Sequence, residues 1–465
     1  MSQRGLLRFV LFASLSVMSC AGSGSSTARS STAGPSSASR ALASPSRVNG
    51  QANVSPATPA PAATPTGPRD PRPFGFAQKG MTREVMAFVT GSQLQYGLQR
   101  LDLDVVSTIA LFSLEASGDG RLVNRGSRWR AWTSPQADAL IARAHAAGTR
   151  VVLSLSRFSW TSAEIATSRQ LLASPARRAR LAREVAAEVA RRGIDGVNVD
   201  FEPIPVGQAR AFSAFVRALR AELDRLGPGY QLTFDITGHF ESYDVAGAMA
   251  AGGADAVYLM GYHYAGPWST IAASNAPLGG PRYDVGDTID RLLRLVRPDQ
   301  LIVGVPYYGH VWPTTSGAIH APTIGPGSDI LYPQAAALAS KVGARYDPIE
   351  QVSWSAWQER DCATCPLHWV QLYYDDARAV AAKWAAVNRR GLLGTGVWTI
   401  AFEGTPGALD RAMRAAFLPA PRTGPGPKGG PRPVRCFRAA PDGCDPACRN
   451  AVAQPIWWCR RQRAS

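Results

Sequence analysis

Eight short apolar runs, most of them separated by segments of helical periodicity, constrain the fold of this chain more than any other feature. The runs cover residues 85–90, 108–113, 150–155, 196–201, 231–236, 256–261, 301–306 and 396–401. The segments between them include 135–147, 176–192, 208–226, 287–296 and 376–389, where apolar residues recur three and four positions apart. Strand and helix alternating eight times predict an α/β fold, a (β/α)8 TIM barrel.

The spacing of the runs predicts how they are connected. The first two runs leave little room for a helix between them, so we expect a short connection. About 90 residues separate the seventh and eighth runs, and the excess, about 306–370, predicts an insertion at the carboxyl-terminal face of the barrel. Helix ends are marked by glycines expected in the left-handed conformation, namely Gly148, Gly193, Gly227 and Gly391.

Composition divides the rest of the chain. Ser, Ala, Pro, Thr and Gly dominate the residues before the barrel, with too few large apolar side chains to offset the entropy of ordering. Pro and Gly dominate a shorter stretch after it. We predict a signal peptide at 1–20, a disordered linker at 21–79, the barrel at 80–420, a second linker at 421–435 and a small cysteine-containing tail at 436–465.

The first twenty residues predict export. Arg4 and Arg8 accompany a short apolar run, 9–18, which is too short to remain as a membrane-spanning helix. The following residues, around Met18 and Cys20, resemble a bacterial lipobox, in which the cysteine is lipidated after cleavage. The alternative is plain signal-peptide cleavage nearby. Either way we expect an exported protein of the cell envelope, held at the membrane only through lipidated Cys20 or otherwise secreted.

The cysteines fit an oxidising compartment. Seven are present, and setting Cys20 aside leaves six, an even number suited to disulfides. Cys362 and Cys365 favour a local disulfide over a zinc or redox site. Four more in the tail could form a two-disulfide module. Trp457 and Trp458 there would either stack on sugar or pack the tail itself.

The charge and the histidines exclude several function classes. The net charge of +16 comes almost entirely from arginines scattered over helix faces such as 177–192, without an aromatic-interleaved basic stretch, so we expect no nucleic-acid partner. Unspecific attraction to an anionic wall or membrane surface stays open. The six histidines are dispersed and no phosphate-cradling glycine loop opens a helix, so we expect no metal and no cofactor.

The stretch 193–203 carries the chemistry. Asn198, Asp200 and Glu202 alternate with apolar residues, so a strand directs all three polar side chains to one face. Pro203 ends the strand, which places the carboxyls at its carboxyl-terminal end, the catalytic face of an α/β barrel. Isolated acids at a strand end are often ordinary loop carboxylates. Flanking apolar residues argue for burial here, and paired carboxyls at a barrel mouth suggest glycoside hydrolysis.

Several motifs extend this interpretation to a family. Asp195-Gly-Val-Asn198-Val-Asp200-Phe-Glu202 resembles the Asp-x-x-Asp-x-Asp-x-Glu motif of glycoside hydrolase family 18, the chitinase-like enzymes. Similar segments follow in the family's order: Leu259-Met260-Gly261-Tyr262-His263, then the strand leading to Tyr307-Tyr308-Gly309-His310, then Gln371 to Asp376, and finally Gly396-Val397-Trp398. The resemblance covers residues 80–420.

The resemblance implies a retaining, substrate-assisted mechanism. Glu202 would be general acid and then general base, and the substrate's own N-acetyl carbonyl would attack the anomeric carbon. Asp200 would hold the acetamide nitrogen, Tyr262 its oxygen, and Trp398 would form the floor under the sugar. The remaining family positions are expected to bind substrate: Asp195, Asn198, Met260, His263 and Tyr308.

Three departures from the family pattern sharpen the hypothesis. Asn198 replaces the second Asp of the motif, so we expect that Asp200, without a proton-sharing partner there, stays ionised. His263 replaces the Asp after Tyr262. Ser154-Leu-Ser-Arg157 replaces the family's Ser-x-Gly-Gly on the third strand, and the larger Arg157 and Phe158 are expected to change the floor beside the catalytic strand. These departures resemble the bacterial peptidoglycan- and spore-cortex-lytic N-acetylglucosaminidase branch.

Two classes of function follow. The first is a monomeric exported glycosidase that cleaves β-1,4 bonds of an N-acetylglucosamine-containing polysaccharide, either chitin or peptidoglycan. The second is a non-catalytic, lectin-like barrel that binds carbohydrate at the cell envelope. Such lectins typically lack the catalytic acid, so Glu202 favours the enzyme.

Overall fold

The computed structural model describes residues 73–95, 101–280, 283–403 and 407–419. The signal peptide with Cys20, both linkers and the cysteine-containing tail lie outside these residues, so the predictions made for them stay predictions. Within the described residues, no helix combines the length and the apolar character needed to cross a bilayer.

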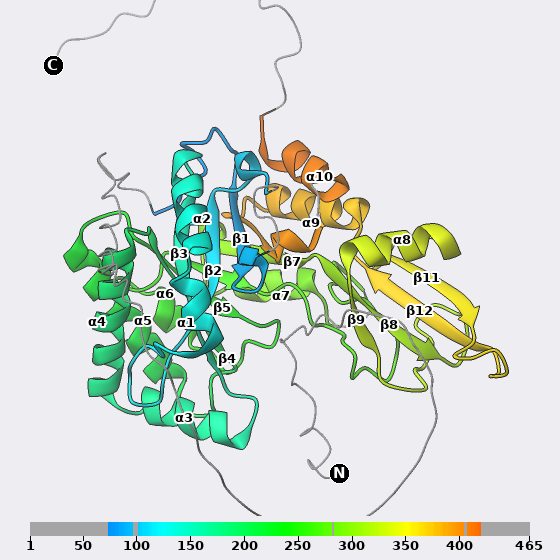
Figure 1. Ribbon diagram of the computed structural model, residues 1–465, viewed down its shortest axis with the longest axis horizontal. Helices are drawn as coiled ribbons and strands as arrows, with labels where there is room; N and C mark the ends of the chain where they lie inside the picture. Colours follow the sequence, from blue (N-terminus) through cyan, green and yellow to red (C-terminus); the bar gives the residue numbers. More distant parts are fainter. Residues whose placement is uncertain (1–72, 96–100, 281–282, 404–406, 420–465) are drawn as a thin grey trace, which may run out of the picture. The chain divides into compact units, whose positions relative to one another are not determined.

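The eight predicted strands close into one parallel barrel (Figure 1). They are β1 (Glu84–Thr90), β2 (Thr108–Glu115), β3 (Arg150–Phe158), β4 (Gly196–Glu202), β5 (Gln231–Ile236), β6 (Ala256–Leu259), β7 (Leu301–Pro306) and β13 (Gly394–Trp398). Each pairs with its neighbours in chain order, and β13 closes the ring against β1. The predicted barrel is confirmed, with the eighth strand beginning and ending a few residues earlier than the sequence indicated.

Helices surround the barrel. They are α1 (Gly126–Trp132), α2 (Pro135–Ala146), α3 (Ser162–Leu172), α4 (Pro175–Arg192), α5 (Ala209–Leu226), α6 (Val245–Met249), α7 (Val285–Leu292), α9 (Ala377–Arg389) and α10 (Ala408–Phe417). Local chemistry sets several ends. Ser174 caps α4 ahead of Pro175 at the first helical position, and Gly193 ends it at φ 63°.

One predicted glycine cap differs. Gly148, Gly193 and Gly391 have φ between 63° and 70°, as expected. Gly227 has φ 136° and ψ 175°, which is not left-handed helical. The next residue is Pro228, whose ring disfavours helical ψ in the residue before it, so the chain leaves α5 extended.

The barrel interior is filled by side chains. The Tyr258 ring, fully buried, occupies its middle and meets the Phe88 ring edge-on at 5.2 Å between centroids. Two neighbouring strands make room for that ring with glycines: a β-carbon at Gly304 would stand 2.3 Å from the Tyr258 hydroxyl oxygen, and one at Gly396 2.1 Å from its ring. The interior below the mouth is therefore a packed core and no channel.

The predicted insertion is a second, antiparallel sheet beside the barrel (Figure 1). It contains β8 (Tyr308–Thr314), β9 (Ser328–Leu331), α8 (Tyr332–Val342), β10 (Arg345–Asp347), β11 (Val352–Glu359) and β12 (His368–Tyr374). It starts directly after β7, at the carboxyl-terminal face of the barrel. Cys362 and Cys365 form a disulfide in the turn between β11 and β12.

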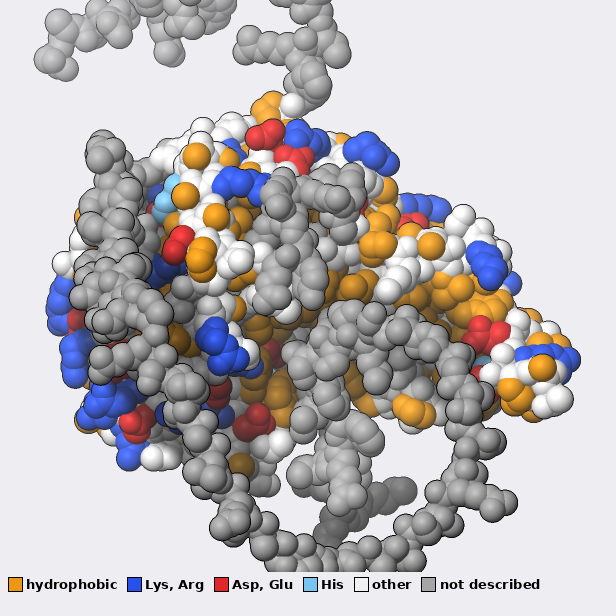
Figure 2. All heavy atoms as spheres, viewed as in Figure 1, with side chains coloured by type: hydrophobic (Ala, Val, Ile, Leu, Met, Phe, Trp, Pro, Cys, Tyr) orange, Lys and Arg blue, Asp and Glu red, His pale blue; other side chains and the backbone are white. Residues whose placement is uncertain are grey.

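The arginines of α4 lie on the outside of the barrel. Figure 2 shows Lys and Arg side chains gathered over the face that α4 forms. This helix carries six arginines, yet its apolar residues, such as Leu181, Val185 and Val189, are fully buried against the barrel. The basic face is thus the solvated side of an amphipathic helix, as the sequence pattern indicated.

Candidate active site

The carboxyl-terminal end of β4 brings the predicted acids together. Parallel pairing sets Ser156 of β3 beside Asp200 and Phe158 beside Glu202. Asp200 is 3% exposed, whereas Glu202 at the strand end is only partly buried. Asp200 therefore lies inside the mouth, and Glu202 lies where a ligand could reach it.

Burial dominates the proton affinities of this pair. Burial raises the pKa of Asp200 to about 6, although a hydrogen bond with Glu202 and the charge of Arg128 lower it. The pKa of Glu202 is raised well above its usual range by burial, then by the nearby Asp200 charge and the hydrogen bond with it. Of the two carboxyls, Glu202 is therefore the one that keeps its proton to higher pH, as a general acid must.

A third acid, which the sequence analysis missed, lies on the adjacent strand. Asp235 of β5 is 2% exposed and accepts a hydrogen bond of 2.6 Å from the Asn198 side-chain amide. Burial, followed by the Asp200 charge, raises its pKa well above the usual range. Asn198 is itself fully buried and also bonds to Ser154 and Thr233 at 3.2 and 3.1 Å. Asn198 thus contacts side chains within the barrel, where a substrate cannot reach it.

Aromatic side chains surround the acids at the mouth. Tyr262 and Met260, which follow β6, are 5% and 7% exposed and belong to the same apolar cluster as Trp398 at the end of β13. The Trp398 ring is half-buried and packs edge-on against the Phe112 ring at 4.8 Å. The predicted sugar floor and the predicted acetamide ligand are thus both at the carboxyl-terminal end of the barrel.

The first residue of the insertion sheet also faces this group. Tyr308 begins β8, and its ring lies 6.2 Å from the Tyr262 ring. His263 is solvent-exposed at φ 65°, and its backbone N–H donates to the Asn275 side chain at 2.8 Å. The exposed Trp268 ring is 6.0 Å from His263 and offers a further apolar surface at the rim.

Asp195 lies at the other end of the same strand. It precedes β4, and its carboxylate accepts a hydrogen bond from the backbone N–H of Val151 at 2.9 Å and contacts His145 Nε2 at 2.8 Å. β4 separates it from Asp200 at the mouth. The structure therefore does not bring Asp195 to the site, and its contacts are those of a residue that joins β4 to α2 and β3.

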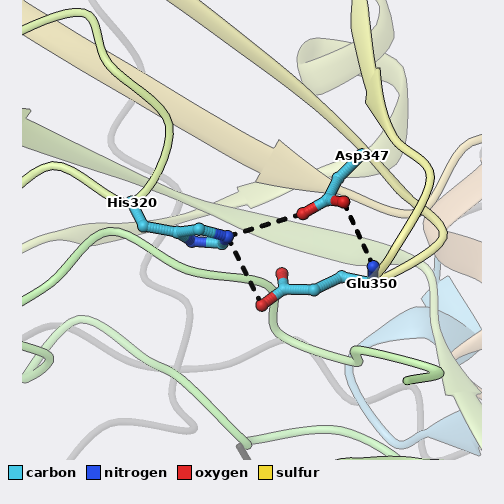
Figure 3. A group of neighbouring side chains, drawn as sticks. All are labelled: His320, Asp347 and Glu350. Atoms are coloured by element: carbon cyan, nitrogen blue, oxygen red, sulfur yellow. Dashed lines mark hydrogen bonds and ion pairs between the residues drawn. The ribbon is translucent and has the colours of Figure 1, made fainter. Parts of the chain in front are cut away.

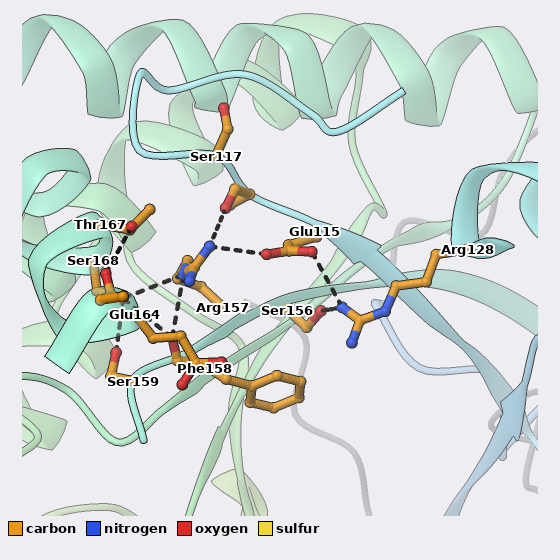
Figure 4. A network of polar contacts seen from close by, with 12 residues as sticks. Glu115, Ser117, Arg128, Ser156, Arg157, Phe158, Ser159, Glu164, Thr167 and Ser168 are labelled. Atoms are coloured by element: carbon orange, nitrogen blue, oxygen red, sulfur yellow. Dashed lines mark hydrogen bonds and ion pairs between the residues drawn. The ribbon is translucent and has the colours of Figure 1, made fainter. Parts of the chain in front are cut away.

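Arg157 does not form the floor that the sequence analysis expected. It pairs in register with Phe201, whose side chain faces outward, and it contacts Glu115 at 2.9 Å and Ser168 at 3.2 Å (Figure 4). The alternation of strand side chains explains this, because Ser156 takes the inward position. Phe158, next to Glu202, remains at the rim.

The same view shows a cation that sequence reasoning missed. Arg128 of α1 donates to the inward Ser156 hydroxyl at 3.1 Å and lies 3.8 Å from Glu115 (Figure 4). Its positive charge lowers the pKa of Asp200. No recognisable sequence pattern marks Arg128, because the α1 segment is short and its neighbours are mixed.

An eight-stranded barrel with two neighbouring carboxyl groups at its carboxyl-terminal mouth has the architecture of the α/β-barrel glycosidases. The sequence profile of the glycosyl hydrolases family 18 matches residues 83–403. The chain belongs to this family.

Individual relatives are distant. The di-N-acetylchitobiase of Rattus norvegicus is 28% identical over 283 residues, which cover 56% of this chain and 72% of that protein. A Bacillus subtilis (strain 168) protein named as a sporulation-specific glycosylase, YdhD, is 25% identical over 249 residues, covering 51% of this chain. The chain spans only about half (54%) of the length of YdhD.

Solved structures share the fold. The GH18 chitinase of Cycas revoluta, crystallised in complex with (GlcNAc)3, superposes with a TM-score of 0.61 at 18% identity. The match covers 72% of this chain and 99% of that one. At this identity the likeness concerns the fold alone.

Proposed function

We propose that the protein is a glycosidase that hydrolyses β-1,4 bonds next to N-acetylglucosamine. The observation that carries this proposal is the position of Glu202 beside Asp200 at the barrel mouth, with Tyr262 and Trp398 clustered at the same end of the barrel. Family membership and the di-N-acetylchitobiase among the relatives support the reaction class.

The residues divide the reaction between them. Glu202 gives its proton to the glycosidic oxygen while the substrate's acetamide oxygen attacks the anomeric carbon, and Glu202 then activates water. Asp200 accepts a hydrogen bond from the acetamide N–H and so orients the group. The Tyr262 hydroxyl donates to the acetamide oxygen, and the Trp398 ring lies under the sugar.

The proposed substrate is a polysaccharide that contains N-acetylglucosamine in its repeating unit. The di-N-acetylchitobiase among the relatives supports a chitin-type glycan. Peptidoglycan is the second candidate, because the departures at Asn198 and His263 resemble the wall-lytic branch of the family. We also propose that the protein is a monomer that acts outside the cytoplasm. Residues 1–20 would direct its export, and lipidated Cys20 would hold it at the membrane.

Incubation of the protein with purified chitin oligomers and with purified peptidoglycan tests the substrate. Mass spectrometry of the released fragments should show products that end in N-acetylglucosamine from at least one polymer, and none with Glu202→Gln. Binding to either polymer without release by the wild-type protein would support the lectin-like alternative and overturn the enzyme.

A further inference from the structure

Asp235 is a buried carboxyl that the proposed mechanism leaves without a role. The register between β4 and β5 pairs Asn198 with Thr233 and Val199 with Phe234. The next step of that register places Asp235 level with Asp200 on the neighbouring strand. Neighbouring strands lie roughly 4.8 Å apart, so two carboxyls on the same inward face stand within reach of each other.

Two such carboxyls cannot both stay charged in a dry interior. Asp200 Oδ1 is buried and has no hydrogen-bond partner among the described residues. A proton on Asp235 would supply one. The Asn198 amide meanwhile donates to Asp235 Oδ1 and to the Thr233 hydroxyl, so it fixes the Asp235 carboxyl from the far side.

We propose that Asp235 is the proton partner of Asp200 and that Asn198 holds it in place for this task. This inference rests on the proposed function. Asp235 is a positioning residue, since it acts on the substrate only through Asp200. The sequence analysis expected Asp200 to lack a proton-sharing partner because position 198 holds an amide. The structure supplies the carboxyl one strand further on.

The proton balance of the step is simple. Before the reaction, Glu202 and Asp235 carry protons and Asp200 is ionised. As Glu202 gives its proton to the leaving oxygen, the Asp235 O–H bond breaks and an Asp200 O–H bond forms. The two negative charges then stand on Glu202 and Asp235, separated by neutral Asp200, whose hydroxyl donates to Glu202 and whose carbonyl oxygen still accepts from the acetamide.

Among the described residues, the charged and titratable groups that bear on this cluster come from several surrounding elements. They are Asp200 and Glu202 on β4, Tyr243 before α6, Tyr258 on β6, Tyr262 after it, Tyr308 at the start of β8, and Arg128 on α1. Arg128 is the cation of this set, and its charge acts on Asp200.

Exchanging the two side chains tests the proposal. Asp235→Asn and Asn198→Asp should each lower kcat on a fluorogenic N-acetylglucosamine oligomer by about 10–100-fold, the range for residues that orient a catalytic group. In Asp235→Asn the low-pH limb of the plot of kcat against pH should move to higher pH. Asp200 then lacks the Asp235 O–H that stabilises its ionised form, so its pKa rises. The double variant Asn198→Asp/Asp235→Asn restores a carboxyl beside Asp200, now at position 198. It should recover most of the wild-type kcat and the wild-type position of the low-pH limb.

Three outcomes decide the matter. A double variant whose loss equals the product of the single losses overturns proton sharing. Proton sharing is also overturned if the low-pH limb of the kcat profile is at the same pH in Asp235→Asn as in the wild type. If the wild type hydrolyses no polymer, the proposed function fails. The pH dependence of the free energy of unfolding then tests, independently of activity, whether Asp235 holds a proton in the folded protein. The raised pKa of Asp235 makes wild-type stability fall as pH rises above about 3.9, and Asp235→Asn must flatten that slope.

A second, independent observation concerns the insertion sheet. His320, Asp347 and Glu350 point toward one another (Figure 3). His320 Nε2 lies 3.4 Å from Asp347 Oδ2 and 3.5 Å from Glu350 Oε1. Histidine spacing in the sequence predicted no metal, because the two carboxylates come from residues that only the fold brings to His320.

In each of these three side chains, the polar atom that faces away from the cluster contacts a neighbouring group and so fixes the side chain's orientation. His320 Nδ1 lies 3.3 Å from the Ala272 carbonyl oxygen, to which it can only donate, so Nε2 is left facing the carboxylates. Asp347 Oδ1 accepts two backbone N–H groups, and Glu350 Oε2 accepts from the Ser274 hydroxyl. These outer contacts orient the side chains so that His320 Nε2, Asp347 Oδ2 and Glu350 Oε1 face one another, as the ligands of a metal ion do.

The geometry points to a zinc-class divalent cation held by His320, Asp347 and Glu350. Nitrogen and oxygen ligands of tetrahedral zinc, at 2.0–2.2 Å from the metal, stand about 3.3–3.6 Å from one another, which fits the two separations. Ser274 and Ala272 belong to the loop after β6, so the ion would fasten the insertion sheet to the barrel at its mouth.

Zinc titration of the full-length protein tests this site. One equivalent should bind, and His320→Ala or Glu350→Gln should weaken binding at least about 10-fold. His368→Ala is the matched control, because within the described part of the chain His368 Nε2 forms an ion pair with Asp361 alone, at 3.8 Å. Circular dichroism checks that each variant folds. Equal zinc affinity in the wild type, His320→Ala and Glu350→Gln, or no zinc bound by the wild type, would leave the cluster as a plain ion pair and overturn the site.

Discussion

The two ends of the barrel interior both bury carboxyl groups, and the difference between them separates structure from function. At the amino-terminal end, Glu84 is fully buried and accepts a hydrogen bond from the Thr108 hydroxyl. Burial raises its pKa to about 7, while hydroxyl hydrogen bonds and the Arg150 charge lower it. At the carboxyl-terminal end, burial raises the pKa of Glu202 too, but there a neighbouring carboxylate raises it further.

A raised pKa alone is therefore a poor guide to a site. Glu84 has hydroxyl and cationic neighbours and no path to solvent, so its proton has no reaction partner. Glu202 has an acidic neighbour and is partly exposed. Access together with a like-charged neighbour distinguishes the reactive acid from the structural one.

The largest expected effect contrasts those two glutamates directly. Glu202→Gln should lower kcat on N-acetylglucosamine oligomers by about 10³-fold or more, because no other group can protonate the leaving oxygen. Glu84→Gln should keep kcat within about twofold, since Glu84 is remote from the mouth. Steady-state kinetics and thermal midpoints measure both. Similar rate losses in the two variants would erase the distinction between the ends.

The next effect compares two buried tyrosines. Tyr262→Phe should lower kcat by about 10²-fold, as for loss of one donor to a developing charge. Tyr307→Phe removes a buried hydroxyl whose acidic neighbours are Glu403 and Asp410, away from the acids of β4, and should change kcat little. Steady-state kinetics of both variants on the same oligomer test this. A greater loss of kcat in Tyr307→Phe than in Tyr262→Phe would contradict the proposed position of the reacting centre.

The third effect lies in stability and concerns the amino-terminal end. Because the pKa of Glu84 is raised by burial, the unfolded chain loses this proton first, so wild-type stability falls as pH rises from about 4.3 to about 7. Glu84→Gln should remove a fall on the order of 3 kcal/mol over that window. Urea unfolding at several pH values measures it. An unchanged slope would show that Glu84 titrates normally.

The smallest effect on activity is expected at the amino-terminal end of β4. Asp195→Asn should leave kcat unchanged, because Asp195 contacts His145 and the Val151 N–H far from the mouth. The variant should lose about 1–2 kcal/mol of stability, the cost of weakening a charged hydrogen bond. Kinetics and chemical unfolding together test this. A tenfold loss of kcat without loss of stability would return Asp195 to the site.

The sequence predicted most of the barrel because strand alternation and helical spacing are local signals. It also predicted the pair Asp200 and Glu202, which lie on one strand. Asp235 was missed because a single acid in an apolar run carries no sign of its neighbour, and only the register of β4 with β5 sets it beside Asp200. Arg157 was placed wrongly although the needed signal is local. Ser156 pairs with the inward-facing Asp200, so the next residue of the strand, Arg157, must face outward.

Tyr258 and the two glycines that admit its ring have a consequence for how the protein tolerates mutation. Any side chain at Gly304 or Gly396 would collide with that ring, which is fully buried. In a saturation survey of all positions, these two glycines would show the same intolerance as the acids of the mouth, although neither meets a ligand. Sensitivity to substitution and contact with substrate are separate properties in this barrel, and its innermost positions display the first without the second.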